Sequence, residues 1–245
     1  MVDAYFGRFV LPEDLRAALQ RCRSIAYIET QEELDELVFG PTHSSRYDVV
    51  YNIVGKGTVK EAEVIRCKNG ASVNFMEDYM RRRDPNSMVI SDDLPTDKPR
   101  FEDRFGYPFA QLRQETMDWF AGQRVILLPF KAGAPDQGYD SLLVCPANAA
   151  FFALALANMQ GFVAIQDIPE DYTPRAIIYV APPFRHTHFD GRQVVVHNRS
   201  ESLHEVFAYN LYPGPSAKKG VYSVLLDIGE HEGWITNHAS AALLE

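Results

Sequence analysis

The residue types best suited to chemistry gather near the end of the chain: Tyr212, Lys218, Lys219 and His238. The two lysines follow a Pro-Gly-Pro-Ser turn and enter an apolar-periodic stretch, so we expect them in the first turn of a helix capped by Ser216. A helix N-terminus favours anions, and two ammonium groups there strengthen that preference. Together with an upstream arginine, these side chains can hold a small polycarboxylate or phosphate beside a divalent metal.

That arginine is Arg83, the last residue of an Arg81-Arg82-Arg83 run in a chain whose net charge is −9. A planar guanidinium matches a carboxylate through two parallel hydrogen bonds. A short basic run is also typical of a solvated loop, just as an isolated Lys-Lys pair is typical of a solvated surface. The residue types alone leave both interpretations open.

The segment from Tyr212 to His238, YPGPSAKKGVYSVLLDIGEHEGWITNH, resembles the end of the N-terminal domain of phosphoenolpyruvate carboxykinases. In that family a tyrosine-glycine turn leads to a Lys-Lys pair, a helix and a metal-binding histidine, and the spacings fit here. The EGW-x-x-H ending is nearer to the GTP-dependent branch. The short turn before the lysines is nearer to the ATP-dependent branch.

Three further stretches agree with this resemblance in the same order along the chain. GQRVILLPFKAGAP, residues 122–135, and the apolar run over residues 142–161 resemble consecutive strands and a helix of the family. RRDPNSMVIS, residues 82–91, resembles the segment whose arginine binds the substrate carboxylate, which places Arg83 on that arginine. The resemblance covers roughly residues 75 to 240, and the first 75 residues match nothing we can place.

The resemblance implies an enzyme that converts oxaloacetate and a nucleoside triphosphate into phosphoenolpyruvate, carbon dioxide and a nucleoside diphosphate. Mn²⁺ or Mg²⁺, held by Lys219 and His238, would stabilise the enolate left by decarboxylation. Arg83 would clamp the substrate carboxylate, Tyr212 would position carbon dioxide or a carboxylate, and Lys218 would screen the phosphate. The expected partner is therefore a small carboxylate or phosphate substrate.

The sequence also departs from the family. No string reads G-x-x-x-x-G-K-[ST], and the nearest one, at residues 55–58, is predicted to be a hairpin turn. We expect an N-terminal fragment of a longer two-domain protein, with weak metal binding and no activity until a C-terminal phosphate-loop domain supplies the nucleotide. The alternatives are a non-catalytic metabolite- or metal-binding module and a structural or interaction domain. The altered residues after Arg83 and the Pro-Gly-Pro at 213–215 bear on the substrate more than on the fold.

Composition limits the class of protein. A hydrophobic content of 46% with 12% aromatic residues is typical of a folded globular chain. The net charge of −9 argues against a nucleic-acid or anionic membrane partner, and no apolar run has the length of a membrane span. Three cysteines without C-x-x-C spacing indicate neither a disulfide framework nor a zinc cluster, so we expect a cytoplasmic protein.

Apolar periodicity predicts a single α/β domain over residues 1–245, with a mixed β-sheet flanked by helices. The resemblance implies that this fold is similar to the carboxykinase N-terminal domain. We expect helices over residues 12–22, 30–38, 109–120, 147–160 and from 217 to about 228, the second of them capped by Thr30. We expect strands over residues 24–29, 47–54, 58–67, 87–91, 124–130, 142–145, 175–181 and 193–197. Residues 92–107, rich in proline and charge, are expected to form a surface connection or a lid.

Other polar residues have weaker patterns. His186 and His188 share the alternate spacing that metals can use in a strand, but no third ligand lies near them in sequence, so a surface loop is expected. Ser202 and His204 do not resemble a nucleophile elbow. We interpret His197 and His204 as structural or solvent-exposed side chains.

Overall fold

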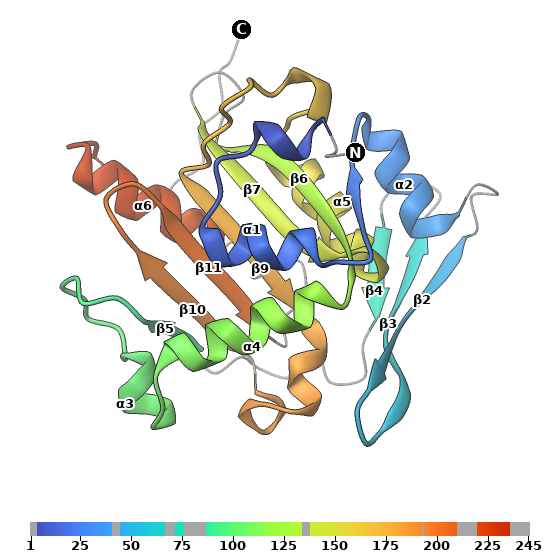
Figure 1. The fold of residues 1–245 in the computed structure, drawn as a ribbon, viewed down its shortest axis with the longest axis horizontal. Coiled ribbons are helices and arrows are strands. Elements are labelled where there is room, and N and C mark those ends of the chain that lie inside the picture. The colour runs from blue at the N-terminus through green and yellow to red at the C-terminus, as the bar shows by residue number, and fades with distance from the viewer. Residues whose placement is uncertain are drawn as a thin grey trace, which may run out of the picture.

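A central mixed sheet flanked by helices on both faces dominates the fold, and a smaller sheet lies beside it (Figure 1). This computed structural model describes residues 4–40, 45–66, 72–75, 87–133, 138–192, 194–209 and 220–235. The predicted α/β class, with a mixed sheet between helices, is confirmed.

The predicted helices and strands occur in the predicted order, and the elements at residues 72–75, 101–105, 161–162 and 204–209 were not predicted. The helices are α1 (Glu13–Gln20), α2 (Gln31–Phe39), α3 (Phe101–Phe105), α4 (Phe109–Ala121), α5 (Ala150–Met159) and α6 (Val221–His231). The strands are β1 (Ser24–Tyr27), β2 (Arg46–Ile53), β3 (Gly57–Arg66), β4 (Ser72–Phe75), β5 (Met88–Ile90), β6 (Arg124–Ala132), β7 (Tyr139–Pro146), β8 (Gly161–Phe162), β9 (Ala176–Ala181), β10 (Val194–Arg199) and β11 (His204–Tyr209).

Two local predictions are confirmed by side-chain geometry. Thr30 caps α2, because its hydroxyl accepts a hydrogen bond from the backbone N–H of Glu33 at 3.3 Å. The carboxylate of Glu33 in turn accepts a hydrogen bond from the N–H of Glu29 at 2.7 Å. Two reciprocal hydrogen bonds therefore stabilise the start of the helix. The turn at residues 55–57 joins β2 to β3 as a hairpin, with positive φ at Gly55 and Gly57.

Residues 92–107 lie mainly at the surface, as expected, and Phe101 is the one residue of the segment that is buried. They also contain the short helix α3, and Asp92 forms an ion pair with Arg199 on β10 at 2.9 Å. The surface connection is therefore fastened to the sheet by one aromatic side chain and one long-range ion pair.

The central sheet has the strand order β1-β6-β7-β9-β11-β10-β5, with β8 paired to β6. The pairs β1·β6, β7·β9, β9·β11 and β10·β5 are parallel, whereas β6·β7 and β10·β11 are antiparallel. The strand β11 was not among the predicted strands, although it lies in the interior of the sheet and all of its residues are buried.

Alternate residues of each strand supply two cores, one on each face of the sheet. On β6, for example, Val125 and Leu127 join one core, and Ile126 and Leu128 join the other. Helices α1 and α4 cover the first face, which is the near face in Figure 1. Helices α2, α5 and α6 cover the opposite face. The sheet is therefore shielded on both sides, as its parallel pairs require.

The smaller sheet, with the order β2-β3-β4, packs into the core that α2 and α5 share. Glu61 on β3 is buried, and its carboxylate meets the imidazole of His186 at 2.7 Å. The predicted interpretation of His186 as a loop residue needs this correction: it lies in a short 3₁₀ turn and contacts a buried carboxylate.

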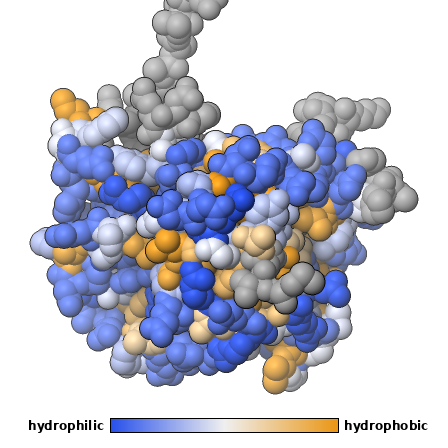
Figure 2. Space-filling model, turned by 45° about the horizontal axis from the view of Figure 1, so that its top comes forward, coloured by the Kyte–Doolittle hydropathy of each residue, from blue (hydrophilic) through white to orange (hydrophobic). Residues whose placement is uncertain are grey.

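The face drawn in Figure 2 is mainly hydrophilic, with apolar residues in separate small patches. Within the part of the chain that the structure describes, no helix combines the length and the apolar character needed to cross a membrane.

The core predicts a clear stability difference between two truncations. Phe152→Ala should lower the free energy of unfolding by about 3–5 kcal/mol, because Phe152 on α5 is fully buried and its loss leaves a cavity. Val54→Ala is the control: Val54 is 96% exposed in the β2–β3 turn, so its truncation should change that free energy by less than about 0.5 kcal/mol. Urea denaturation followed by circular dichroism measures both, and equal destabilisation would contradict the assigned core.

Candidate functional site

The residues that the sequence singles out for chemistry, Arg83, Tyr212, Lys218, Lys219 and His238, lie outside the described residues. The elements on which they depend are described. Arg83 precedes the start of β5 by five residues, Tyr212 follows the end of β11 by three, and Lys219 directly precedes Gly220, the N-cap of α6.

The start of β5 and the end of β11 lie close together in the central sheet, beside the start of β10. We call this row of strand ends the sheet edge. Strand β10 separates them, with Met88 of β5 beside Val195 and Tyr209 of β11 beside Val194. Because β5 runs parallel and β11 antiparallel to β10, strand β5 begins where strand β11 ends. Two interstrand spacings put these points about 10 Å apart.

Helix α6 begins over the same part of the sheet. Ser223, in its first turn, places its hydroxyl 4.0 Å from the sulfur of Met88. A Cβ built on Gly220 would lie 3.2 Å from a methyl group of Val206 on β11, so the chain passes close to the sheet here. Further along α6, Asp227 reaches His197 on β10. The first turn of α6 therefore lies over the start of β5 and the middle of β11, three residues before β11 ends at Tyr209.

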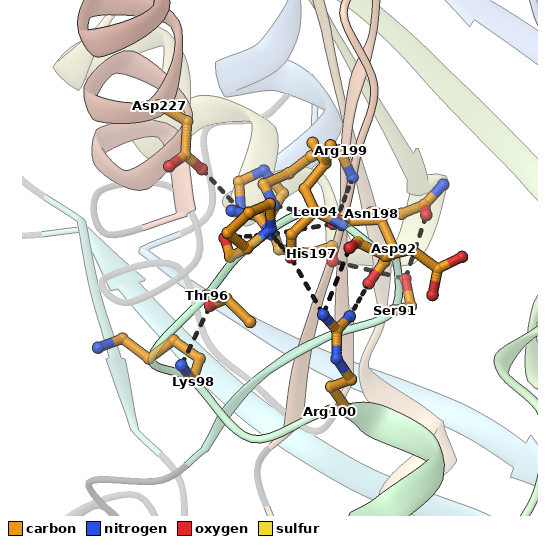
Figure 3. Close-up of polar contacts among 12 residues, drawn as sticks. Ser91, Asp92, Leu94, Thr96, Lys98, Arg100, His197, Asn198, Arg199 and Asp227 are labelled. Atoms are coloured by element: carbon orange, nitrogen blue, oxygen red, sulfur yellow. Dashed lines mark hydrogen bonds and ion pairs between the residues drawn. The ribbon is translucent and has the colours of Figure 1, made fainter.

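A separate polar cluster lies at the other end of the β10–β11 hairpin. His197 pairs with Val206 and His204 pairs with Arg199, so both histidines face α6 as diagonal neighbours. The Nδ1 atom of His204 lies 3.4 Å from Nε2 of His197, and Nδ1 of His197 lies 3.5 Å from a carboxylate oxygen of Asp227. Figure 3 shows Asp227 reaching down from the helix to His197.

Burial sets the charge of these three groups. It lowers the pKa of His197 to about 3 and that of His204 to about 4, and positive side chains nearby act in the same direction. Burial also raises the pKa of Asp227 above its usual range. Both imidazoles are thus neutral at neutral pH, and each has a nitrogen lone pair available as a hydrogen-bond acceptor or a metal ligand.

A pocket of about 530 Å³ opens beside this cluster, and His204 and Asp227 both line it. Its wall also includes Arg175 and Arg199. The guanidinium of Arg175 contacts Glu232 at 3.4 Å through Nη2, while its Nε atom is buried without a hydrogen-bond partner.

An ion pair between Arg199 and Asp92 also stabilises the pocket wall (Figure 3). Arg199 donates two hydrogen bonds to the carboxylate of Asp92, at 2.9 and 3.0 Å. Burial alone would raise the pKa of that carboxyl, but the arginine lowers it below its usual range. Arg100 binds the carbonyl groups of Asp92 and Leu94, so the loop that closes the pocket is fixed at several points.

On the opposite face of the same hairpin, Glu205 is almost fully buried and accepts three hydrogen bonds. The donors are the guanidinium of Arg113 at 2.7 Å, the hydroxyl of Tyr179 at 2.8 Å and the amide of Asn198 at 3.0 Å. Arg113 also pairs with Asp14 on α1. This network fixes the start of β11 from the side away from α6, which makes the positions of the two histidines well defined.

The interpretation of His197 and His204 as structural or solvent-exposed residues missed this arrangement. Both are buried, at 1% and 7% exposure, and they meet across a tight connection in which the N–H of Ser200 donates to the carbonyl of Leu203. The available signal was their spacing of seven residues around Ser-Glu-Ser-Leu, which places both on one face of a hairpin. The spacing has this meaning only if residues 204–209, HEVFAY, form a strand, which the sequence analysis did not predict.

Comparison with known proteins gives one family. The family model described as "Domain of unknown function (DUF4914)" matches residues 11–244, nearly the whole chain. No curated protein matches the sequence.

The buried histidines predict a stability loss in mild acid. In a chelator-treated sample, the unfolded chain takes up protons near pH 6.5, whereas folded His197 and His204 resist protonation to about pH 3 and 4. Their contribution is therefore complete above pH 6.5 and declines as pH falls, by at most about 1.4 kcal/mol per pH unit for each. Urea denaturation at pH 7, 6 and 5 should show a smaller decline for His204→Gln than for the wild type. Parallel declines would contradict the burial of His204 as a neutral group.

Proposed function

We propose that this chain, which belongs to the DUF4914 family, forms the substrate- and metal-binding half of an enzyme similar to phosphoenolpyruvate carboxykinases. The observation that carries the proposal is the common sheet edge reached by β5, β11 and α6. The three chain segments that adjoin these elements bear Arg83, Tyr212 and the Lys218-Lys219 pair, respectively. These residues are widely separated in the sequence, but the elements they adjoin lie close together, and we propose that they form one site there.

The proposed reaction uses these side chains in distinct roles. Oxaloacetate loses carbon dioxide, and the resulting enolate oxygen accepts the terminal phosphoryl group of a nucleoside triphosphate. Arg83 would hold the substrate carboxylate, Tyr212 would orient the departing carboxylate, and Lys218 would screen the phosphoryl charge. Mn²⁺ or Mg²⁺ beside Lys219 and His238 would supply further stabilisation of the enolate charge.

The direction of α6 favours anions at this edge. The N-terminal end of a helix carries the positive end of its dipole, and Gly220, just before Val221, already has helical backbone angles of φ −61° and ψ −49°. The lysine pair directly precedes the N-cap, Gly220, so its charges add to the helix potential. A carboxylate or phosphoryl group at the edge would meet both.

The return of the chain towards His238 sets a strict geometric condition. Helix α6 extends to His231, three residues past its predicted end, and the N–H of Trp234 then bonds the carbonyl of Gly229 at 2.7 Å. Gly229 is eight residues beyond Val221, a rise of about 12 Å. The four residues from Trp234 to His238 span about 13 Å when extended. The proposal therefore requires a nearly straight chain from Trp234 to His238.

These 245 residues contain no G-x-x-x-x-G-K-[ST] string, so the proposal assigns the nucleotide to a further phosphate-loop domain. A non-catalytic module that binds a metal or a metabolite remains the second candidate. The pocket beside His204 and Asp227 favours it, because an imidazole, a carboxylate and two guanidinium groups meet in its wall.

Metal and dicarboxylate binding test the proposal directly. Oxalate, a stable dicarboxylate, should increase the affinity of the purified chain for Mn²⁺, and Arg83→Ala should remove that increase. Lys219→Ala and His238→Ala should each weaken Mn²⁺ binding at least tenfold, about 1.4 kcal/mol. Electron paramagnetic resonance, which counts free Mn²⁺, measures all of these affinities.

The matched control is His188→Gln, since His188 contacts Glu115 at 2.8 Å and has no assigned role in the proposed site. Its affinity for Mn²⁺ should equal that of the wild type. Mn²⁺ binding that is unchanged in both Lys219→Ala and His238→Ala would contradict the proposed function.

A further inference from the structure

We infer that His197, His204 and Asp227 form a second divalent-metal site, of the kind that binds Zn²⁺, with an open coordination position facing the pocket. One ligand atom from each of the three side chains lies within 4.8 Å of the others. The inference goes beyond the proposed function, because it concerns the opposite end of the β10–β11 hairpin and uses none of the residues assigned to the carboxykinase-like site.

The distance between the two imidazoles suits metal ligands better than a hydrogen bond. Zinc–nitrogen bonds of 2.0–2.1 Å in a tetrahedron separate neighbouring ligand atoms by about 3.3–3.4 Å. His204 Nδ1 and His197 Nε2 are 3.4 Å apart. A direct hydrogen bond from one nitrogen would normally be shorter, at about 2.7–3.2 Å. The two nitrogens are therefore spaced as two vertices of a metal site. The Asp227 carboxylate lies 3.5 Å from the other ring nitrogen of His197, and one ligand atom of each of the three residues lies within 4.8 Å of the others, so Asp227 would supply the third vertex.

The donor set supports the same metal class. Two imidazoles and one carboxylate are typical of open zinc sites, in which three protein ligands leave the fourth position for water or a substrate. Both histidines are buried, at 1% and 7% exposure, and neutral imidazole is the form that coordinates a metal. The third ligand comes from α6, so a bound metal would join the helix to the hairpin.

The pocket gives the fourth position a defined surrounding. His204 and Asp227 line it, while His197 lies behind them at 1% exposure, so an incoming ligand would reach the metal from the pocket side. Arg175 borders the same space, and its buried Nε has no hydrogen-bond partner. Arg199 is already engaged by Asp92. The positive charge of the two arginines in this wall favours a small anion as the exogenous ligand.

The two proposed sites are far enough apart to act independently. His204 begins β11 and lies five strand steps, about 17 Å, from Tyr209 at its end, and His197 lies three steps, about 10 Å, from Val194 at the start of β10. A change at one site should therefore leave metal binding at the other intact, and the two proposals can fail separately.

Calorimetric titration with Zn²⁺ tests the inference on the Lys219→Ala chain, in which only the second site should remain. In that background, His204→Gln and Asp227→Asn should each weaken Zn²⁺ binding at least tenfold, about 1.4 kcal/mol. His188→Gln is the matched control and should bind Zn²⁺ as the Lys219→Ala parent does. Circular dichroism confirms that each variant is folded before its affinity is compared.

X-ray absorption at the zinc edge gives a readout that needs no substitution among the proposed ligands. The Lys219→Ala chain with one equivalent of Zn²⁺ should show two imidazole nitrogens and further oxygen ligands at about 2.0–2.2 Å. A hydrogen-bonded Asp227–His197–His204 relay without metal affinity would give no saturable Zn²⁺ binding. That result, a spectrum without two imidazoles, or unchanged affinity in both ligand variants would overturn the inference.

Discussion

The packing of α6 against the β10–β11 hairpin is the constraint on which the functional surfaces depend. Val221, Val224 and Ile228 lie on one stripe of the helix and are almost fully buried against the sheet. Gly220 allows the first turn to approach Val206, where a larger residue would crowd its methyl group. This close approach seats the first turn of α6 on the middle of β11, and two turns later Asp227 reaches His197 on the neighbouring strand.

The antiparallel hairpin explains why two surfaces arise from the same few elements. The paired ends Val194 and Tyr209 meet the start of β5, whereas the paired ends Arg199 and His204 meet the Asp92 loop and the later turns of α6. The first end is surrounded by segments with cationic side chains in the sequence. The second holds buried imidazoles and carboxylates. Binding at one end, both or neither separates the enzyme proposal from that of a binding module.

Local signals were sufficient for most elements of the fold. The apolar period of α4, the threonine cap of α2 and the glycine turn between β2 and β3 are each encoded within a few residues, and the structure has them where predicted. The expected helix after residue 217 was also found, with its described part at α6. The mixed sheet followed from the alternation of these elements along the chain.

Long-range contacts were beyond sequence reasoning. The strand β11 contains His204 and Glu205, two polar residues whose burial is compensated by partners on β9, β10 and α4. The attachment of residues 92–107 to the sheet was not predicted, because the ion pair between Asp92 and Arg199 joins positions 107 residues apart. The histidine–aspartate cluster needed three elements at once, and no local pattern specifies such a meeting. The carboxykinase-like residues, in contrast, came from resemblance and are a proposal.

The most direct test of the central claim is an anomalous difference map from a crystal of the protein soaked with Mn²⁺ and oxalate, recorded at the manganese edge. The account predicts a peak at the sheet edge where β5 begins and β11 ends, within bonding distance of Lys219 and His238, with oxalate held by Arg83. A map with manganese elsewhere and no peak at that edge would contradict it.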